Sequence, residues 1–154
     1  MKWTFQVSPH NISEYLITSS EGKMLSFKYS QLQRSIRMKY NDHRAVYMLD
    51  NKGFSAKKTL LKNVYGSEIG TISKSMLRDH TGTVTLNDSL FRLDYKIGVA
   101  KHTIDISNEK ISATCHFSEG WNKEQGEMYM IAMIVLSWMY SVQTLEQVSL
   151  AVHH

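Results

Sequence analysis

Residues 128–142 read MYMIAMIVLSWMYSV, and this stretch decides the fold. Thirteen of its fifteen side chains are apolar or aromatic, and the other two are small serines. The run is longer than an ordinary strand and contains neither Gly nor Pro, which favours a helix. A helix that is apolar on every side must be buried on every side, either in lipid or inside protein.

Length separates these two environments. Fifteen helical residues span about 22 Å, which is shorter than the roughly 30 Å hydrocarbon core of a bilayer. Polar residues flank the run, with Glu127 on one side and Gln143 on the other. The small residues Ser137 and Ser141 allow a neighbouring wall to approach closely. We therefore expect a helix enclosed by protein, not an integral membrane protein.

Short alternating segments separated by turn residues fill most of the chain before this helix. Turn signals every 8–12 residues are typical of an all-β barrel or sandwich, and the absence of helical crossovers predicts an antiparallel sheet. Residues 8–20 are read as a short helix or a covering loop, and Gly70 inside a strand indicates a bulge or bend. The expected strands are residues 2–7, 23–30, 35–40, 43–50, 54–61, 68–73, 83–86, 89–95, 102–106 and 111–117.

A helix about 10 Å across can be surrounded by β-structure only in a closed or nearly closed barrel of about eleven or twelve strands. We therefore predict a mainly β fold, an antiparallel barrel of about 10–12 strands around a buried hydrophobic C-terminal helix. The whole chain, 1–154, is expected to form a single domain. Its barrel strands occupy about 2–117 and its central helix about 126–142, and helical spacing continues beyond 142.

Several kinds of chemistry find no support in the sequence. The N-terminal residues lack the pattern of a secretory signal, and the single cysteine, Cys115, cannot form an intrachain disulfide, so a cytoplasmic location is expected. The seven histidines show no metal-ligand spacing, and the neighbours Cys115 and His116 point to opposite faces of a strand. Asp79 and His80 lack a serine in a nucleophile elbow. We expect no metal, no cofactor and no enzymatic activity.

Charge is distributed unevenly along the chain. Residues 23–78 carry twelve Lys and Arg against three acids, a local net charge of +9, whereas the whole chain carries +4. Two explanations remain open: the bases solvate the wet face of a sheet, or they attract phosphates and anionic lipid headgroups. The candidate ligand-binding residues are Arg34, Arg37, Lys39, Arg44, Lys57, Lys58 and Lys62.

Three of these candidates are expected to converge. Arg37 and Lys39 share one face of a strand, and Arg44 lies just across a predicted turn, as multidentate phosphate binding requires. Tyr29, Tyr40 and Tyr47 are interleaved with the basic residues. Such tyrosines would also suit stacking on single-stranded nucleic acid, which is the weaker variant.

A family resemblance adds to this interpretation. The basic β meander, with YGSEIGTISKS at 65–75 and EMYMIAMIVLSWMYSV at 127–142, resembles the tubby C-terminal-like superfamily, especially its LURP-one-related and scramblase-like members. The resemblance covers roughly residues 22–145. It implies a twelve-stranded barrel around a C-terminal hydrophobic helix and a link to phosphoinositides. The phosphoinositide-contacting residues of tubby proteins have no residue-by-residue counterparts in this sequence.

The sequence therefore leads to a non-enzymatic binding module whose basic β face contacts anionic lipid headgroups or phosphorylated ligands. Such a module would be cytoplasmic and peripheral at a membrane. The alternative is a structural or protein-interaction domain with a protein partner, in which the charges only solubilise the sheet. A nucleic-acid binder or an enzyme is the third and weakest interpretation.

Overall fold

The computed structural model describes residues 1–8, 14–50, 58–75, 80–87, 90–118 and 126–152, with helix side chains described for 128–147. In these residues eleven strands form one closed barrel, and each strand pairs with its neighbours in the sequence. The strands are β1 (Lys2–Val7), β2 (Glu14–Ser19), β3 (Met24–Ser30), β4 (Ser35–Tyr40), β5 (His43–Asp50), β6 (Lys58–Lys62), β7 (Glu68–Lys74), β8 (Thr81–Leu86), β9 (Phe91–Gly98), β10 (Thr103–Ser107) and β11 (Ser112–Phe117).

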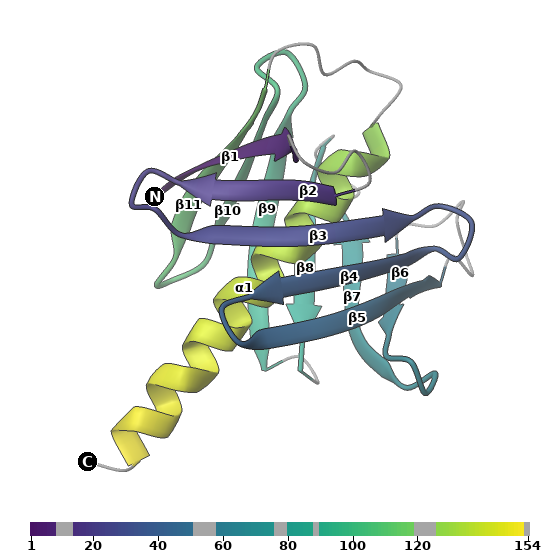
Figure 1. Cartoon of the computed structure of the whole chain (residues 1–154), viewed down its shortest axis with the longest axis vertical. Coiled ribbons are helices and arrows are strands. Elements are labelled where there is room, and N and C mark those ends of the chain that lie inside the picture. Colours follow the sequence, from purple (N-terminus) through teal and green to yellow (C-terminus); the bar gives the residue numbers. More distant parts are fainter. Residues whose placement is uncertain (9–13, 51–57, 76–79, 88–89, 119–125, 153–154) are drawn as a thin grey trace.

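The helix α1 (Gly126–Val152) passes through the barrel (Figure 1). Its side chains from Met128 to Ser141 are buried, apart from the half-buried Met130, whereas those from Leu145 to Gln147 are exposed. The predicted barrel around a hydrophobic helix is therefore confirmed. The helix is longer than the predicted 126–142, because no Gly or Pro follows to end it. Its first turn lies at one end of the barrel, and its last turns project from the other, the exit end.

The longer helix changes the argument about lipid. The segment Met128–Gln147 is long and apolar enough to cross a membrane by length and composition. The length argument that excludes a span is therefore wrong. Burial accounts for the apolar character, because most of this segment is enclosed by the barrel wall. Inward-facing side chains of the strands supply the other half of the core: on β1, for example, Trp3 and Phe5 are buried whereas Lys2 and Thr4 are exposed.

Two details of the sheet differ from the prediction. The barrel closes through a parallel pair, β1 with β11, although every other pair is antiparallel. An antiparallel meander reverses direction at each step, so the first and last of an odd number of strands run the same way. Residues 14–19 form a strand and not the predicted helix or loop, because pairing with both β1 and β3 overrides the local helical spacing.

Other local predictions are confirmed. Asn41 and Asp42 form the turn of the β4–β5 hairpin. Gly70 lies beside a bulge, where the β6–β7 register shifts between Leu61 and Lys62. A Cβ on Gly70 would approach the Thr85 carbonyl oxygen to 2.5 Å, so glycine is needed for the close strand approach there. The predicted strand residues 54–57 lie outside the described residues.

Hydrogen bonds of tyrosine hydroxyl groups link the helix to the barrel wall at both ends of the barrel. The Tyr129 hydroxyl lies 3.0 Å from His102 Nδ1, near the start of the helix. Trp3 Nε1 donates to the Tyr140 hydroxyl at 3.0 Å, near the exit end. Ser137 Oγ donates to the Met133 carbonyl within the helix, so its burial leaves no hydroxyl proton unpaired. The helix is thus fixed along its axis by directional bonds as well as by apolar packing.

Candidate functional site

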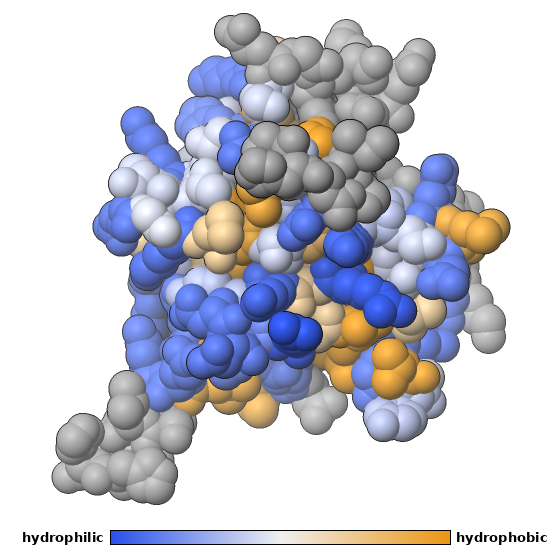
Figure 2. Space-filling model, in the orientation of Figure 1, coloured by the Kyte–Doolittle hydropathy of each residue, from blue (hydrophilic) through white to orange (hydrophobic). Residues whose placement is uncertain are grey.

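The outer surface of β3, β4 and β5 carries a group of cations. Lys28, Arg37, Lys39 and Arg44 are all exposed, and each alternates with buried or half-buried neighbours on its strand. We call these four residues the basic cluster. Figure 2 shows hydrophilic side chains gathered on this face of the barrel, over β3 to β5.

Strand register sets the spacing within the basic cluster. Lys28 lies directly opposite Arg37, and Lys39 lies directly opposite Arg44. Directly opposed side chains have Cβ atoms about 5 Å apart, and like charges in such pairs are destabilising. Three neighbouring strands place all four cations within about 10 Å across the sheet. The cluster is therefore a dense positive surface.

Acidic groups do little to neutralise this surface. Among the described residues, no member of the basic cluster is within ion-pair distance of a carboxylate. Glu14 is opposite Lys28 in the β2–β3 register but does not pair with it. Repulsion between cations about 5 Å apart in water-like surroundings is about 1 kcal/mol per pair. An external anion would relieve this repulsion.

The structure separates the sequence-predicted candidates. Arg37, Lys39 and Arg44 come together as expected. Arg34 lies in the β3–β4 turn, at the other end of β4 from Lys39, with a φ of 51° and its carbonyl bonded to the Leu49 amide. Lys62 Nζ lies 2.7 Å from Asp50 Oδ2, so its charge is already partnered.

One further candidate stands apart from the cluster. Lys58 is exposed at the start of β6, opposite Ser73 of β7. Lys57 lies outside the described residues. Lys28 was missed by the sequence analysis, although its alternation with the apolar Phe27 and Tyr29 places it on the wet face.

The interleaved tyrosines do not form part of this surface. Tyr40 and Tyr47 are buried, and Tyr29 packs against the core. Burial raises the pKa of Tyr47 to about 12, because its charged form would be desolvated. Alternation explains why these tyrosines point inward, since each tyrosine neighbours an outward-facing residue on its strand. The prediction that these three tyrosines could stack on single-stranded nucleic acid is therefore wrong.

A shallow hollow borders the basic cluster. It has a volume of about 520 Å³ and lies between the β2–β3 and β4–β5 turns, lined on one side by Lys39 and on the other by Lys23, with Glu21 nearby. Its lining mixes the charges of two lysines and one glutamate. It extends the positive surface toward the exit end of the barrel.

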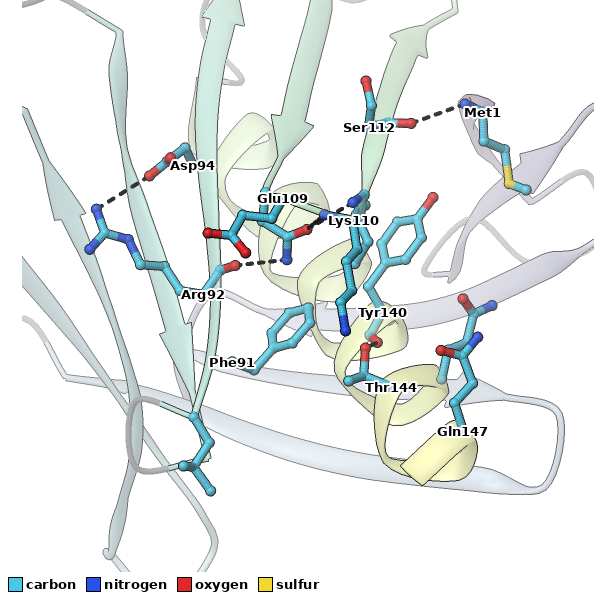
Figure 3. Close-up of a pocket in the computed structure, with 14 residues that line it drawn as sticks. Met1, Phe91, Arg92, Asp94, Glu109, Lys110, Ser112, Tyr140, Thr144 and Gln147 are labelled. Carbon is cyan, nitrogen blue, oxygen red and sulfur yellow. Dashed lines mark hydrogen bonds and ion pairs between the residues drawn. The ribbon is translucent and has the colours of Figure 1, made fainter. Parts of the chain in front are cut away.

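A larger hollow of about 930 Å³ lies where the helix leaves the barrel. Asn108 Oδ1 accepts hydrogen bonds from the amides of Lys110 and Ile111, which fixes the turn that lines one wall. Figure 3 shows the Lys110 amine reaching toward the helix near Thr144, and the Glu109 carboxylate on the side of Arg92. Opposite charges therefore alternate around this hollow, and it does not concentrate positive charge as the basic cluster does.

The part of the chain that the structure describes brings together no groups suited to metal or thiol chemistry. No three His, Cys, Asp or Glu side chains within the described ranges gather as metal ligands. Cys115 is buried whereas His116 is exposed, as alternation predicts. Burial raises the pKa of the Cys115 thiol to about 12, which suppresses the reactive thiolate. Asp79 lies outside the described residues.

Fold and surface together define a class of protein: a closed barrel around a central helix, with a basic outer face on β3 to β5. Comparison with known protein families, with characterised proteins and with solved structures finds no match.

Proposed function

We propose that this protein is a non-enzymatic binding module whose basic cluster takes phosphate-bearing anions, either lipid headgroups or a phosphorylated ligand. The resemblance to the tubby C-terminal-like superfamily and a cytoplasmic, membrane-peripheral location are parts of this proposal. One observation carries it: two like-charge pairs lie side by side on one wall, without an ion pair among the described residues.

The physical argument is that a rigid sheet keeps these cations together at a cost. Opposed positions in the barrel wall hold the Cβ atoms of each pair about 5 Å apart, and only the flexible ends of the side chains can turn apart. An approaching phosphate gains attraction from several cations at once and removes their mutual repulsion. Each basic residue near an anionic membrane surface contributes about 1 kcal/mol to binding. Binding should therefore be multivalent, additive to a first approximation and sensitive to salt.

The decisive experiment is vesicle flotation across a salt series. Parent protein is mixed with phosphatidylcholine vesicles with and without phosphatidylserine. Replacing Arg37, Lys39 and Arg44 together by glutamine should remove about 3 kcal/mol, which weakens binding to anionic vesicles roughly a hundredfold. A matched control replaces Lys96, Lys101 and Lys110, which are exposed bases outside the cluster, by glutamine. This control variant has the same net charge as the cluster variant, but it should bind like the parent.

A calorimetric titration with inositol hexakisphosphate tests whether the basic cluster binds a soluble phosphorylated ligand instead of a lipid headgroup. Heat of binding without flotation would assign a soluble phospho-ligand, and flotation without it would assign the lipid surface. Parent protein that binds neither probe at low salt would refute the proposal, as would equal losses in the two triple variants. The protein-interaction interpretation would then replace it.

A further inference from the structure

The barrel wall next to the basic cluster carries half-buried apolar side chains that face outward. Val46 and Met48 alternate with buried Tyr47 and Leu49 on β5, so they face outward, and Leu60 faces outward on β6 in the same way. None of these three is among the partly buried hydrophobics that pack against the core. Figure 2 shows orange side chains beside the blue ones along this part of the barrel.

Two more apolar side chains extend this surface beyond the end of β6. Val64 and Tyr65, in the β6–β7 turn, are 63 % and 90 % exposed. Together with Val46, Met48 and Leu60 they form what we call the apolar flank. Strand register joins it to the basic cluster, because Val46 lies directly opposite Arg37. Met48 lies opposite Lys62 and Leu60 opposite Asp50, so the Lys62–Asp50 ion pair lies within the apolar flank.

The turn holds its apolar tip rigidly away from the barrel. Asn63 Oδ1 accepts hydrogen bonds from the amides of Tyr65 and Ser67, each at 3.0 Å. The Gly66 amide donates to the Asn63 carbonyl at 3.0 Å, and Gly66 has a φ of 83°, a conformation that glycine adopts readily. The tip therefore cannot fold back to hide Val64 and Tyr65. Contact with an apolar phase would release their hydration without an added ordering cost.

The base of this turn carries one positive and two negative charges, a net charge of −1. Lys62 pairs with Asp50, and Glu68 is opposite Lys62 across the bulge. The positive charge of this surface comes from the basic cluster on β3, β4 and β5. The surface thus has a cationic part and an apolar part that adjoin on one convex wall.

We propose that this surface docks on a lipid bilayer, with the basic cluster at the headgroups and the apolar flank inserted into the interface. The inference rests on the proposed function and assigns its partner. A convex wall cannot enclose a soluble ligand, whereas a deformable bilayer can meet it. Tyrosine beside aliphatic and basic side chains is the composition typical of membrane–water interfaces.

If the apolar flank inserts into the bilayer, part of the binding free energy should persist at high salt. Screening weakens the attraction of the basic cluster but leaves apolar burial intact. In the double variant Val64→Ser/Tyr65→Ser, binding to anionic vesicles at high salt should fall about tenfold or more. The matched control is Leu32→Ser, because Leu32 is 95 % exposed but lies in the β3–β4 turn, away from the exit end. The control should bind like the parent.

Spin labels provide the direct test. Tyr65→Cys and Leu32→Cys are each labelled with a nitroxide, and the buried Cys115 stays unlabelled in the native protein. On phosphatidylcholine–phosphatidylserine vesicles, the label at 65 should become more accessible to oxygen and less accessible to a nickel chelate. The label at 32 should stay aqueous.

The outcomes separate the inference from the proposed function. Flotation with both labels aqueous would mean adsorption by charge alone; it would overturn the inference and leave the proposed function standing. Absence of flotation by the parent would overturn the inference, and the proposed function would then rest on the soluble probe alone. A shift at 32 instead of 65 would overturn the docking geometry.

Discussion

The helix inside the barrel can be tested at Ile134, which is 0 % exposed and lies midway along the buried segment. We predict that Ile134→Asp abolishes soluble folding. Removing a buried isoleucine side chain costs about 2–5 kcal/mol, and an unpaired buried carboxylate costs several more or must take up a proton. The sum consumes most or all of the roughly 5–15 kcal/mol by which a domain is stable.

The measurement is soluble yield together with urea unfolding followed by circular dichroism. Leu145→Asp makes a comparable change on the same helix, but Leu145 is 56 % exposed, so the free energy of unfolding should change by about 0.5 kcal/mol or less. Ile134→Val should cost about 0.5–1.5 kcal/mol and keep the fold measurable. Soluble Ile134→Asp protein with the parent's unfolding midpoint would refute the enclosed helix, and so would equal damage from Leu145→Asp.

Two further predictions concern buried polar groups. Tyr140→Phe leaves the buried Trp3 indole N–H without its acceptor and should lower the free energy of unfolding by about 1–3 kcal/mol; an unchanged urea midpoint would contradict this. Burial raises the pKa of both Tyr47 and Cys115 to about 12. The unfolded chain therefore loses these protons first, and stability should fall as pH rises from about 9 toward 12, which urea midpoints along an alkaline series would detect.

Local pattern in the sequence was enough for much of the architecture. The run from Met128 to Val142 contains no water-tolerant face, so burial follows from composition alone. Alternation in segments such as SIRMKY at 35–40 assigns each side chain to a face, because successive strand residues point to opposite sides. Alternation would also have predicted that Tyr29, Tyr40 and Tyr47 face the core. It would likewise have placed Lys28 on the outer face with the basic cluster.

Long-range pairing was decided only in three dimensions. Residues 14–19 become a strand because β1 and β3 lie on either side, and neither neighbour is visible in the local pattern. Asp50 forms an ion pair with Lys62 across the β5–β6 pair, although the two residues are twelve positions apart in the sequence. The charge of a basic residue can be read directly, but whether that charge is already neutralised depends on register.

The candidate docking surface shows the same division. Its cations and apolar side chains can each be recognised in the sequence, but their adjacency arises because β4, β5 and β6 pair in one particular register. The parallel closure of β1 on β11 likewise depends on the odd strand count, which only the complete barrel shows. Periodicity acts between neighbours in the chain and assigns the faces, whereas register joins residues distant in the chain and decides which side chains on a face meet.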